Sequence, residues 1–186
     1  PQFINPLLAI SDADRDLSSL AYAGLMGLSG TGSFVPVLAE NYTLSADGKT
    51  YDFTLRKNAK FSDGTLVTAD DVIFTVEKAQ NPALKSPSYS DWSGVSVKMI
   101  DQRTVRFTLL KPYAPFLGLT TLGILPARLW RNISNAEFPF STLETSPVGA
   151  GPFKVANVSR DASGLIKNVS FVYNPYYVLG RPYLDS

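Results

Sequence analysis

Two short stretches contain residues whose types and spacing could support chemistry: the acidic pair Asp70-Asp71 and the glycine pair in Gly149-Ala150-Gly151. Paired carboxylates act as general acid and base in glycosidases, and they also bind metal ions. Neighbouring residues in a helix, however, point about 100° apart, so the two carboxylates would not converge on one ion or one bond. Thr68 stands at the spacing of a helix capping box, with Asp71 in place of the usual Glu. The sequence therefore predicts that the acidic pair begins a helix.

The glycine pair could form a loop that holds a phosphate group. A phosphate loop of that kind continues with Gly-Lys-Ser or Gly-Lys-Thr, whereas Pro152 follows Gly151 directly. The sequence therefore predicts a turn at this place.

The absence of two residue types narrows the chemistry further. The 186 residues include no Cys and no His, which excludes disulfides, thiolate nucleophiles and thiolate metal sites within this sequence. It also excludes serine triads and other sites built on His, the commonest general base and metal ligand. A catalyst would have to use carboxylates, Lys or Tyr, so binding is the favoured kind of function, with no cofactor and no metal site.

Length and charge argue against other classes of protein. A chain of 186 residues with 17 Lys+Arg and 16 Asp+Glu fits one domain, or one domain with a small subdomain, and has no overall field that favours nucleic acid. The longest apolar runs are too short to span a bilayer. No leader of the signal-peptide type opens the sequence, so we expect any export signal to lie outside it.

The hydrophobic pattern predicts two longer helices. One is expected from Ser11 to Gly27, because apolar residues recur there at helical spacing. The other is expected to begin at the Thr68 cap and to end at Asn81-Pro82.

Alternating apolar residues predict strands. They lie at 51–56, 95–99, 105–109, 153–155 and 169–173, with a turn at 101–103 that makes a hairpin of the second and third. The apolar stretch 117–125 follows neither period, and its state stays open. Antiparallel strands with segregated helices are typical of the α+β class, with antiparallel or mixed sheets and a few helices.

Two Asp-Gly turns and one arginine have structural interpretations. Gly48 and Gly64 are expected to take a positive φ, and Asp47 and Asp63 to bond back to their own turn backbones. Arg56 is expected to pair with a surface carboxylate rather than to contact a ligand.

The order of landmarks along the whole chain resembles that of the peptide, dipeptide and nickel-binding class of bacterial extracellular solute-binding proteins, family 5. The resemblance rests on nine stretches: 5–8, 22–25, 36–40, 45–56, 60–64, 68–72, 149–153, 174–177 and 180–185. One departure is Ala150, where the family usually has Thr.

The resemblance implies the first lobe of a two-lobe periplasmic binding protein, class II-like and of cluster C. Members of the family are more than twice as long, so we expect residues 1–186 to be a partial single lobe and the second lobe to be absent from this sequence. Within it, residues of about 1–40 are expected to belong to the cleft-forming subdomain. Residues 41–186 are expected to form mostly the extra α+β subdomain plus the return segment.

The same resemblance places the cleft face at three points, and the corresponding residues here are Asp14, Arg15, Tyr89, Trp92, Leu122 and Gly123. Aromatic rings with one polar tip suit a peptide. Trp92, however, could equally pack its loop onto the hairpin, and Asp14 could simply be an acid favoured at a helix start. A cation in the first turn gains nothing from the helix dipole, so Arg15 is a stronger candidate for function.

The function implied is that of the substrate-binding component of an ABC importer, which captures peptides outside the cytoplasmic membrane, in the periplasm or as a surface lipoprotein. Its partners would be a peptide or small-molecule ligand and a membrane permease, and it would be neither an enzyme nor a nucleic-acid-binding protein. Two alternatives stay open: a lobe that binds a nickel chelate or a haem-like ligand, and a carboxylate-dependent hydrolase.

Overall fold

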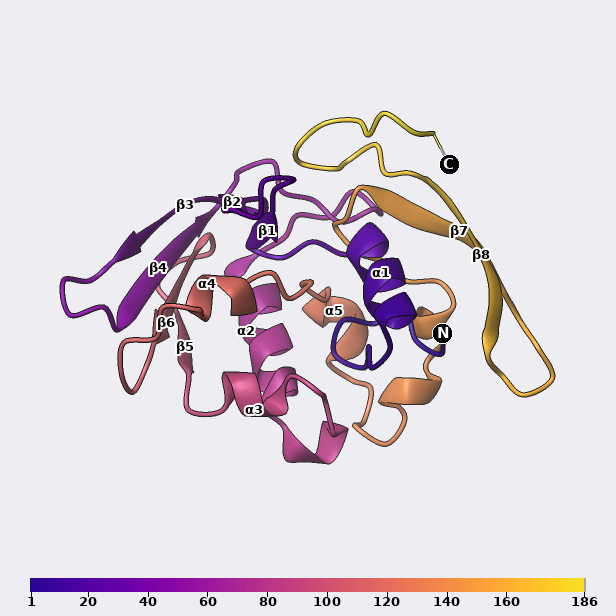
Figure 1. The fold of residues 1–186 in the computed structure, drawn as a ribbon, viewed down its shortest axis with the longest axis horizontal. Coiled ribbons are helices and arrows are strands. Elements are labelled where there is room, and N and C mark those ends of the chain that lie inside the picture. Colours follow the sequence, from indigo (N-terminus) through magenta and orange to yellow (C-terminus); the bar gives the residue numbers. More distant parts are fainter. Residues whose placement is uncertain (186) are drawn as a thin grey trace.

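A computed structural model describes residues 1–185 of the chain (Figure 1). The helices are α1 (Asp12–Ala21), α2 (Ala69–Ala79), α3 (Tyr89–Trp92), α4 (Phe116–Leu119) and α5 (Ala127–Trp130), with 3₁₀ turns at Pro82–Leu84, Phe138–Phe140 and Thr142–Glu144. The strands are β1 (Met26–Leu28), β2 (Phe34–Pro36), β3 (Ala39–Leu44), β4 (Thr50–Leu55), β5 (Ser96–Met99), β6 (Thr104–Thr108), β7 (Phe153–Arg160) and β8 (Ile166–Tyr173).

All strand pairs are antiparallel: β1 with β2, β7 with β8, and four strands in the order β3-β4-β6-β5. The predicted α+β class is confirmed, as are the hairpin of β5 and β6 and the pair of β7 and β8. The stretch 117–125 forms the end of the one-turn helix α4, then a turn at 120–121 and a segment without regular secondary structure.

The four-stranded sheet buries one face against α2 (Figure 1). Along β4, Tyr51, Phe53 and Leu55 are buried and the residues between them are half-buried, which is the period of two of a strand with one core face. Phe53 meets Phe107 of β6 edge to face, with ring centroids 5.7 Å apart. Aromatic packing therefore forms the centre of this core.

Helix α2 begins and ends as predicted. The Thr68 hydroxyl and the Asp71 carboxylate form a capping box, and Asn81-Pro82 follows the helix. Asp70 is exposed and pairs with Arg131 (2.6 Å). Asp70 and Asp71 thus both lie in the first turn of a helix, and their carboxylates bind different partners.

The prediction that the first helix continues to Gly27 is wrong, since α1 ends at Ala21. Its start is confirmed, because Ser11 caps it. Beyond the end, the backbone amide of Gly151 donates to the Ala21 carbonyl (3.0 Å) and the amide of Met26 donates to the Thr120 carbonyl (3.1 Å). These hydrogen bonds to distant segments hold residues 22–28 extended in spite of their helical spacing.

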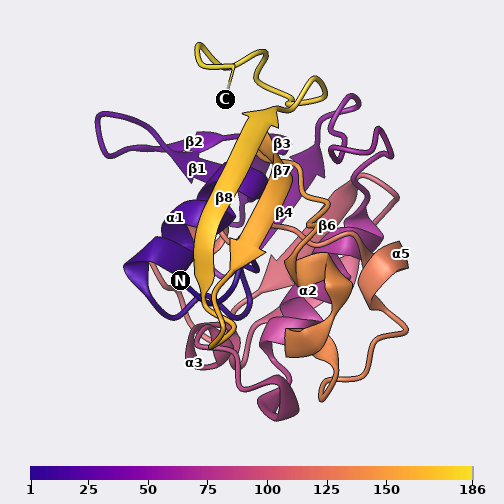
Figure 2. The ribbon, with the colours of Figure 1, turned by 90° about the vertical axis from the view of Figure 1, so that its right-hand side faces the viewer.

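Strands β7 and β8 form a long two-stranded ribbon beside α1 (Figure 2). At its base Asn174 folds back, and its side-chain amide donates to the Gly151 carbonyl (2.8 Å). The chain bends at Gly151 and Pro152, next to the place where the sequence predicts a turn. A Cβ atom at Gly149 would lie only 2.1 Å from the Ala21 carbonyl oxygen, so this turn packs backbone against the end of α1.

The two Asp-Gly turns are confirmed, with φ of 69° at Gly48 and 87° at Gly64. Asp47 accepts a hydrogen bond from the Lys49 amide (3.1 Å) and Asp63 one from the Thr65 amide (3.0 Å).

The expectation for Arg56 is wrong. Its Nε donates to the Val37 carbonyl (2.8 Å), and within residues 1–185 no carboxylate pairs with it. The surface carboxylate Glu40 pairs with Arg103 instead (3.2 Å). The side chain of Arg56 thus fastens the segment before β3 to the end of β4.

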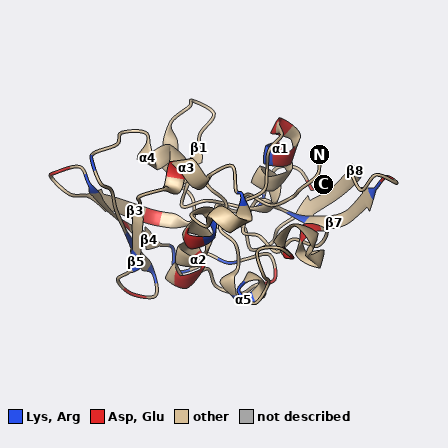
Figure 3. Cartoon of the chain, turned by 90° about the horizontal axis from the view of Figure 1, so that it is seen from below, with Lys and Arg blue, Asp and Glu red and all other residues tan. Residues whose placement is uncertain are grey.

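Basic and acidic residues are scattered over the elements rather than gathered by sign (Figure 3). The pairs that form, such as Arg106 with Asp52 (2.7 Å), lie at the surface, where each contributes little to stability. None of the helices in residues 1–185 combines the length and the apolar character needed to cross a membrane.

Candidate functional site

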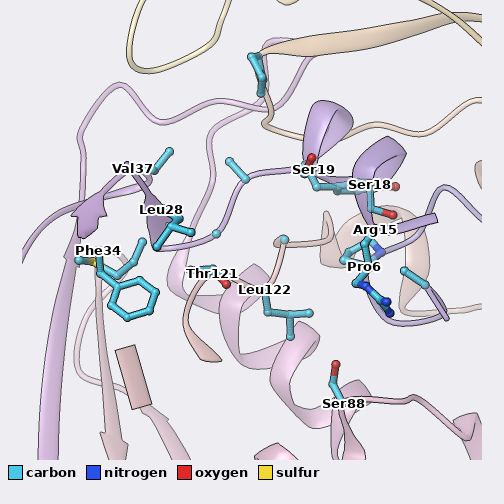
Figure 4. A pocket seen from close by; sticks show the side chains of 18 of the residues that line it. Pro6, Arg15, Ser18, Ser19, Leu28, Phe34, Val37, Ser88, Thr121 and Leu122 are labelled. Carbon is cyan, nitrogen blue, oxygen red and sulfur yellow. The ribbon is translucent and has the colours of Figure 1, made fainter. Parts of the chain in front are cut away.

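An open cavity of about 750 Å³ lies between α1, the β1–β2 hairpin, residues 121–123 and the segment that leads into α3 (Figure 4). Its volume falls within the range of sites that bind small molecules and short peptides. Pro152 and Tyr177, which follow in the chain much later, complete the lining. The cavity is therefore assembled from segments that are far apart in the sequence.

The floor of the cavity consists of two segments, 22–26 and 120–124, that bond to each other. The Met26 amide donates to the Thr120 carbonyl (3.1 Å) and the Ile124 amide to the Ala23 carbonyl (2.9 Å). Glycines permit this approach: a Cβ atom at Gly24 would lie 2.6 Å from the Thr120 carbonyl oxygen, and one at Gly123 would lie 2.6 Å from Cβ of Tyr22. The floor offers a ligand mostly backbone and small side chains.

The two ends of the cavity differ in chemistry. Leu28, Phe34 and Val37 lie at one end, and Arg15 lies at the other, with Thr121 and Leu122 between them (Figure 4). Two charged residues are found among those that line the cavity: Arg15, on α1, and Asp91, on α3.

Arg15 is placed at the cavity by its position on α1. Its Nη1 donates to the Ile10 carbonyl (2.7 Å), and its Nη2 donates to Asp12 (2.5 Å). A guanidinium has five N–H donors, so this side chain, which is 56% exposed, keeps others for a ligand. The Ser88 hydroxyl points across the opening toward it (Figure 4).

Asp14 lies next to Arg15 in sequence but is buried, with 3% exposure, and does not line the cavity. Its carboxylate accepts hydrogen bonds from the backbone amides of Gln2 (2.6 Å), Phe3 (3.2 Å) and Ser11 (3.1 Å). Burial raises the pKa of Asp14, but the hydrogen bonds together lower it by more. The pKa of this carboxyl group therefore lies below its ordinary value. In this structure Asp14 fastens the N-terminal segment to the start of α1.

The two aromatic candidates also lie outside the cavity. Trp92 is 3% exposed, and its ring packs against Phe107 and Phe116, with centroids 5.9 and 6.0 Å away. The alternative left open for Trp92, packing onto the hairpin, is what the structure shows. Tyr89 is 40% exposed and does not line the cavity, while its neighbour Ser88 does.

Leu122 and Gly123 both line the cavity. Leu122 also borders a small interior space next to Trp92, so it separates the cavity from the core. Of the six predicted residues, the structure brings Arg15, Leu122 and Gly123 together.

The prediction did not include Leu28 and Phe34. A hairpin signal was present, because the glycine-containing stretch 29–33 separates these two apolar residues. Gly30 in this stretch is also, with Gly27, a signal for the end of the first helix, and the hairpin was not predicted.

A buried carboxyl group lies near the cavity wall. Glu144 is 2% exposed, its Oε1 accepts a hydrogen bond from the side-chain amide of Asn5 (2.7 Å), and its Oε2 has no partner in residues 1–185. Burial raises the pKa of Glu144 to about 7. Burial and then the nearby Glu144 charge raise the pKa of Tyr22, which lines the cavity.

The model of one protein family matches residues 33–186, and its description is "Bacterial extracellular solute-binding proteins, family 5 Middle". The chain belongs to this family. Among curated family 5 proteins, the Dipeptide-binding protein of Escherichia coli (strain K12) is 35% identical over 185 residues, which cover 87% of this chain and 34% of that protein.

Solved structures agree. The oligopeptide-binding protein AppA from Bacillus subtilis, solved in complex with a nonapeptide, superimposes with a TM-score of 0.88 at 28% identity. The match covers 100% of this chain and 36% of the AppA chain. NikZ from Campylobacter jejuni, solved in complex with Ni(L-His), superimposes with a TM-score of 0.85 at 31% identity. The match covers 97% of this chain and 35% of the NikZ chain. The chain thus spans about a third of the length of these family 5 relatives.

Proposed function

We propose that the protein is the substrate-binding component of an ABC importer and that its cavity binds a peptide or a related small solute. The observation that carries the proposal is an open cavity of about 750 Å³, with backbone and one guanidinium exposed to it, in a chain of family 5. Relatives are named for dipeptides, for di- and tripeptides and for glutathione.

Binding would need no bond chemistry. The chain would be one lobe of a two-lobe protein, with the cavity as one wall of the cleft, and hinge closure would enclose the ligand before the closed form docks on a membrane permease. The expected division near residue 40 remains part of this proposal. Residues on both sides of that division line the cavity. The location would be extracytoplasmic, in the periplasm or at the cell surface.

A function without catalysis fits the residues at the cavity. Asp91 is the carboxylate among the lining residues of the described chain, and it has no acidic neighbour there. A glycosidase-type hydrolase needs a pair of acids facing one bond. No group of three metal-ligating side chains comes together in residues 1–185 either.

The second candidate ligand is a nickel chelate or a haem-like molecule. The similarity to NikZ, solved with Ni(L-His), favours it. Because this sequence has no His or Cys, the chelating groups would have to come from the ligand itself or from elsewhere in the protein.

Calorimetry on two proteins tests the proposal. The complete gene product should bind short peptides with micromolar affinity, which corresponds to about −8 kcal/mol. The 186-residue chain alone should bind them at millimolar concentration or not at all, because one wall supplies about half of the contacts and admits water. Failure of the complete gene product to bind any peptide would refute the peptide assignment, and tight binding by the chain alone would refute the two-lobe arrangement.

A further inference from the structure

The apolar end of the cavity is formed by a cross-strand pair. Leu28 of β1 and Phe34 of β2 stand directly opposite each other, so their side chains lie on the same face of the hairpin. Both line the cavity, and they remain 65% and 42% exposed. Adjacent large apolar side chains that stay exposed at the edge of a cavity are typical of a ligand-contact surface.

The position of the Phe34 ring depends on Gly118. A Cβ atom at Gly118 would lie 3.2 Å from Cζ of Phe34, a distance at which the ring would have to shift. The absence of that side chain lets the ring rest against α4 while it still borders the cavity. The apolar wall is therefore supported from behind.

The opposite end of the cavity carries the guanidinium of Arg15. Asp91 also lines the cavity, while the middle part that separates Arg15 from Leu28 and Phe34 carries uncharged residues. Thr121 and Leu122 occupy that middle part (Figure 4). A ligand with an apolar group and an anionic group at its two ends would thus meet complementary chemistry in only one orientation. In the reverse orientation, its carboxylate would lose water against Leu28 and Phe34 without gaining a partner.

We propose that the cavity fixes its ligand in one direction, with a carboxylate at Arg15 and an apolar side chain against Leu28 and Phe34. This rests on the proposed function, and it adds a substrate preference: short peptides with a free C-terminus and an apolar side chain near the N-terminus. Phe34 and Arg15 are then specificity-determining residues that act independently.

Three probes separate the two ends: phenylalanyl-alanine, its C-terminal amide, and seryl-alanine. The complete gene product should bind phenylalanyl-alanine roughly tenfold or more tightly than either of the other two, because each of these lacks one of the two groups. Isothermal titration calorimetry gives the two ratios of Kd, acid against amide and Phe against Ser.

Each of two variants should abolish one of the two preferences. Phe34→Ser should bring the Phe-against-Ser ratio close to one and leave the acid-against-amide ratio unchanged, and Arg15→Gln should do the reverse. The matched controls are Phe140→Ser, which changes an exposed ring (86%) outside the cavity, and Arg131→Gln, which removes an arginine that pairs with Asp70 on α2 as Arg15 pairs with Asp12 on α1. Both controls should keep both ratios.

The outcomes distinguish the peptide function from the directional binding. A complete wild-type protein that binds none of the three probes would overturn the peptide function and this inference with it. Binding without either preference, or variants that lose both ratios together, would leave the peptide function standing and overturn the directional binding.

Discussion

The carboxylate of Asp71 accepts a hydrogen bond from the backbone amide of Ala127 (2.8 Å) and at the same time caps the helix α2. One oxygen bonds the Thr68 amide (2.8 Å) and the other the Ala127 amide. The start of α2 and the start of α5 are thereby joined through one buried side chain.

Replacement of this carboxylate should destabilise the fold. Asp71→Ala leaves a buried amide without a partner and removes a cap, so we expect a loss of about 2–4 kcal/mol in the free energy of unfolding. The control Asp70→Ala removes an exposed ion pair with Arg131 and should cost less than about 1 kcal/mol. Urea unfolding of the 186-residue chain measures both. Equal losses in the two variants would contradict the role of Asp71.

The buried Glu144 should make stability depend on pH. Its pKa is raised from the ordinary value of 4.5 to about 7, so between these values the folded state holds one proton more than the unfolded state. The stabilisation is complete below about pH 4.5 and is lost as the pH rises through 7, by an amount on the order of 3 kcal/mol.

The absence of His from the sequence leaves this pH window nearly free of other titrating side chains. Unfolding curves from pH 5 to 8 should therefore show a decline for the wild type and a flat profile for Glu144→Gln. The exposed Glu137→Gln is the control and should keep the decline. A decline that persists in Glu144→Gln would assign it to another group.

The turn at the glycine pair should not tolerate a side chain. A Cβ atom at Gly151 would lie 2.5 Å from the Leu20 carbonyl oxygen, and backbone cannot move aside as a flexible side chain can. Gly151→Ala should cost about 3 kcal/mol, whereas Gly30→Ala, where a Cβ atom meets open space, should be nearly neutral. Thermal unfolding distinguishes the two, and a small effect at Gly151 would show that the turn can separate from α1.

Trp92→Ala should act on stability rather than on ligand recognition. Removal of the buried ring from its place against Phe107 and Phe116 is expected to cost about 3–5 kcal/mol. Tyr89→Ala, at an exposed neighbour, should change stability by less than about 1 kcal/mol. Denaturant unfolding gives the stability. A folded Trp92→Ala variant with normal stability and lost binding would contradict this prediction and indicate that Trp92 contacts the ligand.

Local signals in the sequence predicted the elements well where one short stretch contains all of the determinants. The caps at Ser11 and Thr68 and the turns at Gly48 and Gly64 are of this kind, because each requires only its neighbours in sequence. The resemblance to family 5 placed Arg15, Leu122 and Gly123, all of which line the cavity.

The rest depends on contacts between distant segments. The end of α1 is set by Gly151 and Thr120, which no local pattern contains. Trp92 stands in a polar loop in the sequence, yet the loop folds its ring under the sheet, and Phe34 is brought to the cavity by its pairing with Leu28. Burial and pairing of this kind are properties of the assembled fold rather than of local sequence.

The floor of the cavity also has a consequence for the order of events in folding. Because the amide of Met26 meets the carbonyl of Thr120, about half of the chain must close into a loop before that surface exists, and such long-range closure slows folding. The hairpin of β5 and β6 needs only its own residues and can form early. Competence to bind should therefore return in the slow phase of refolding, after much of the secondary structure has already formed.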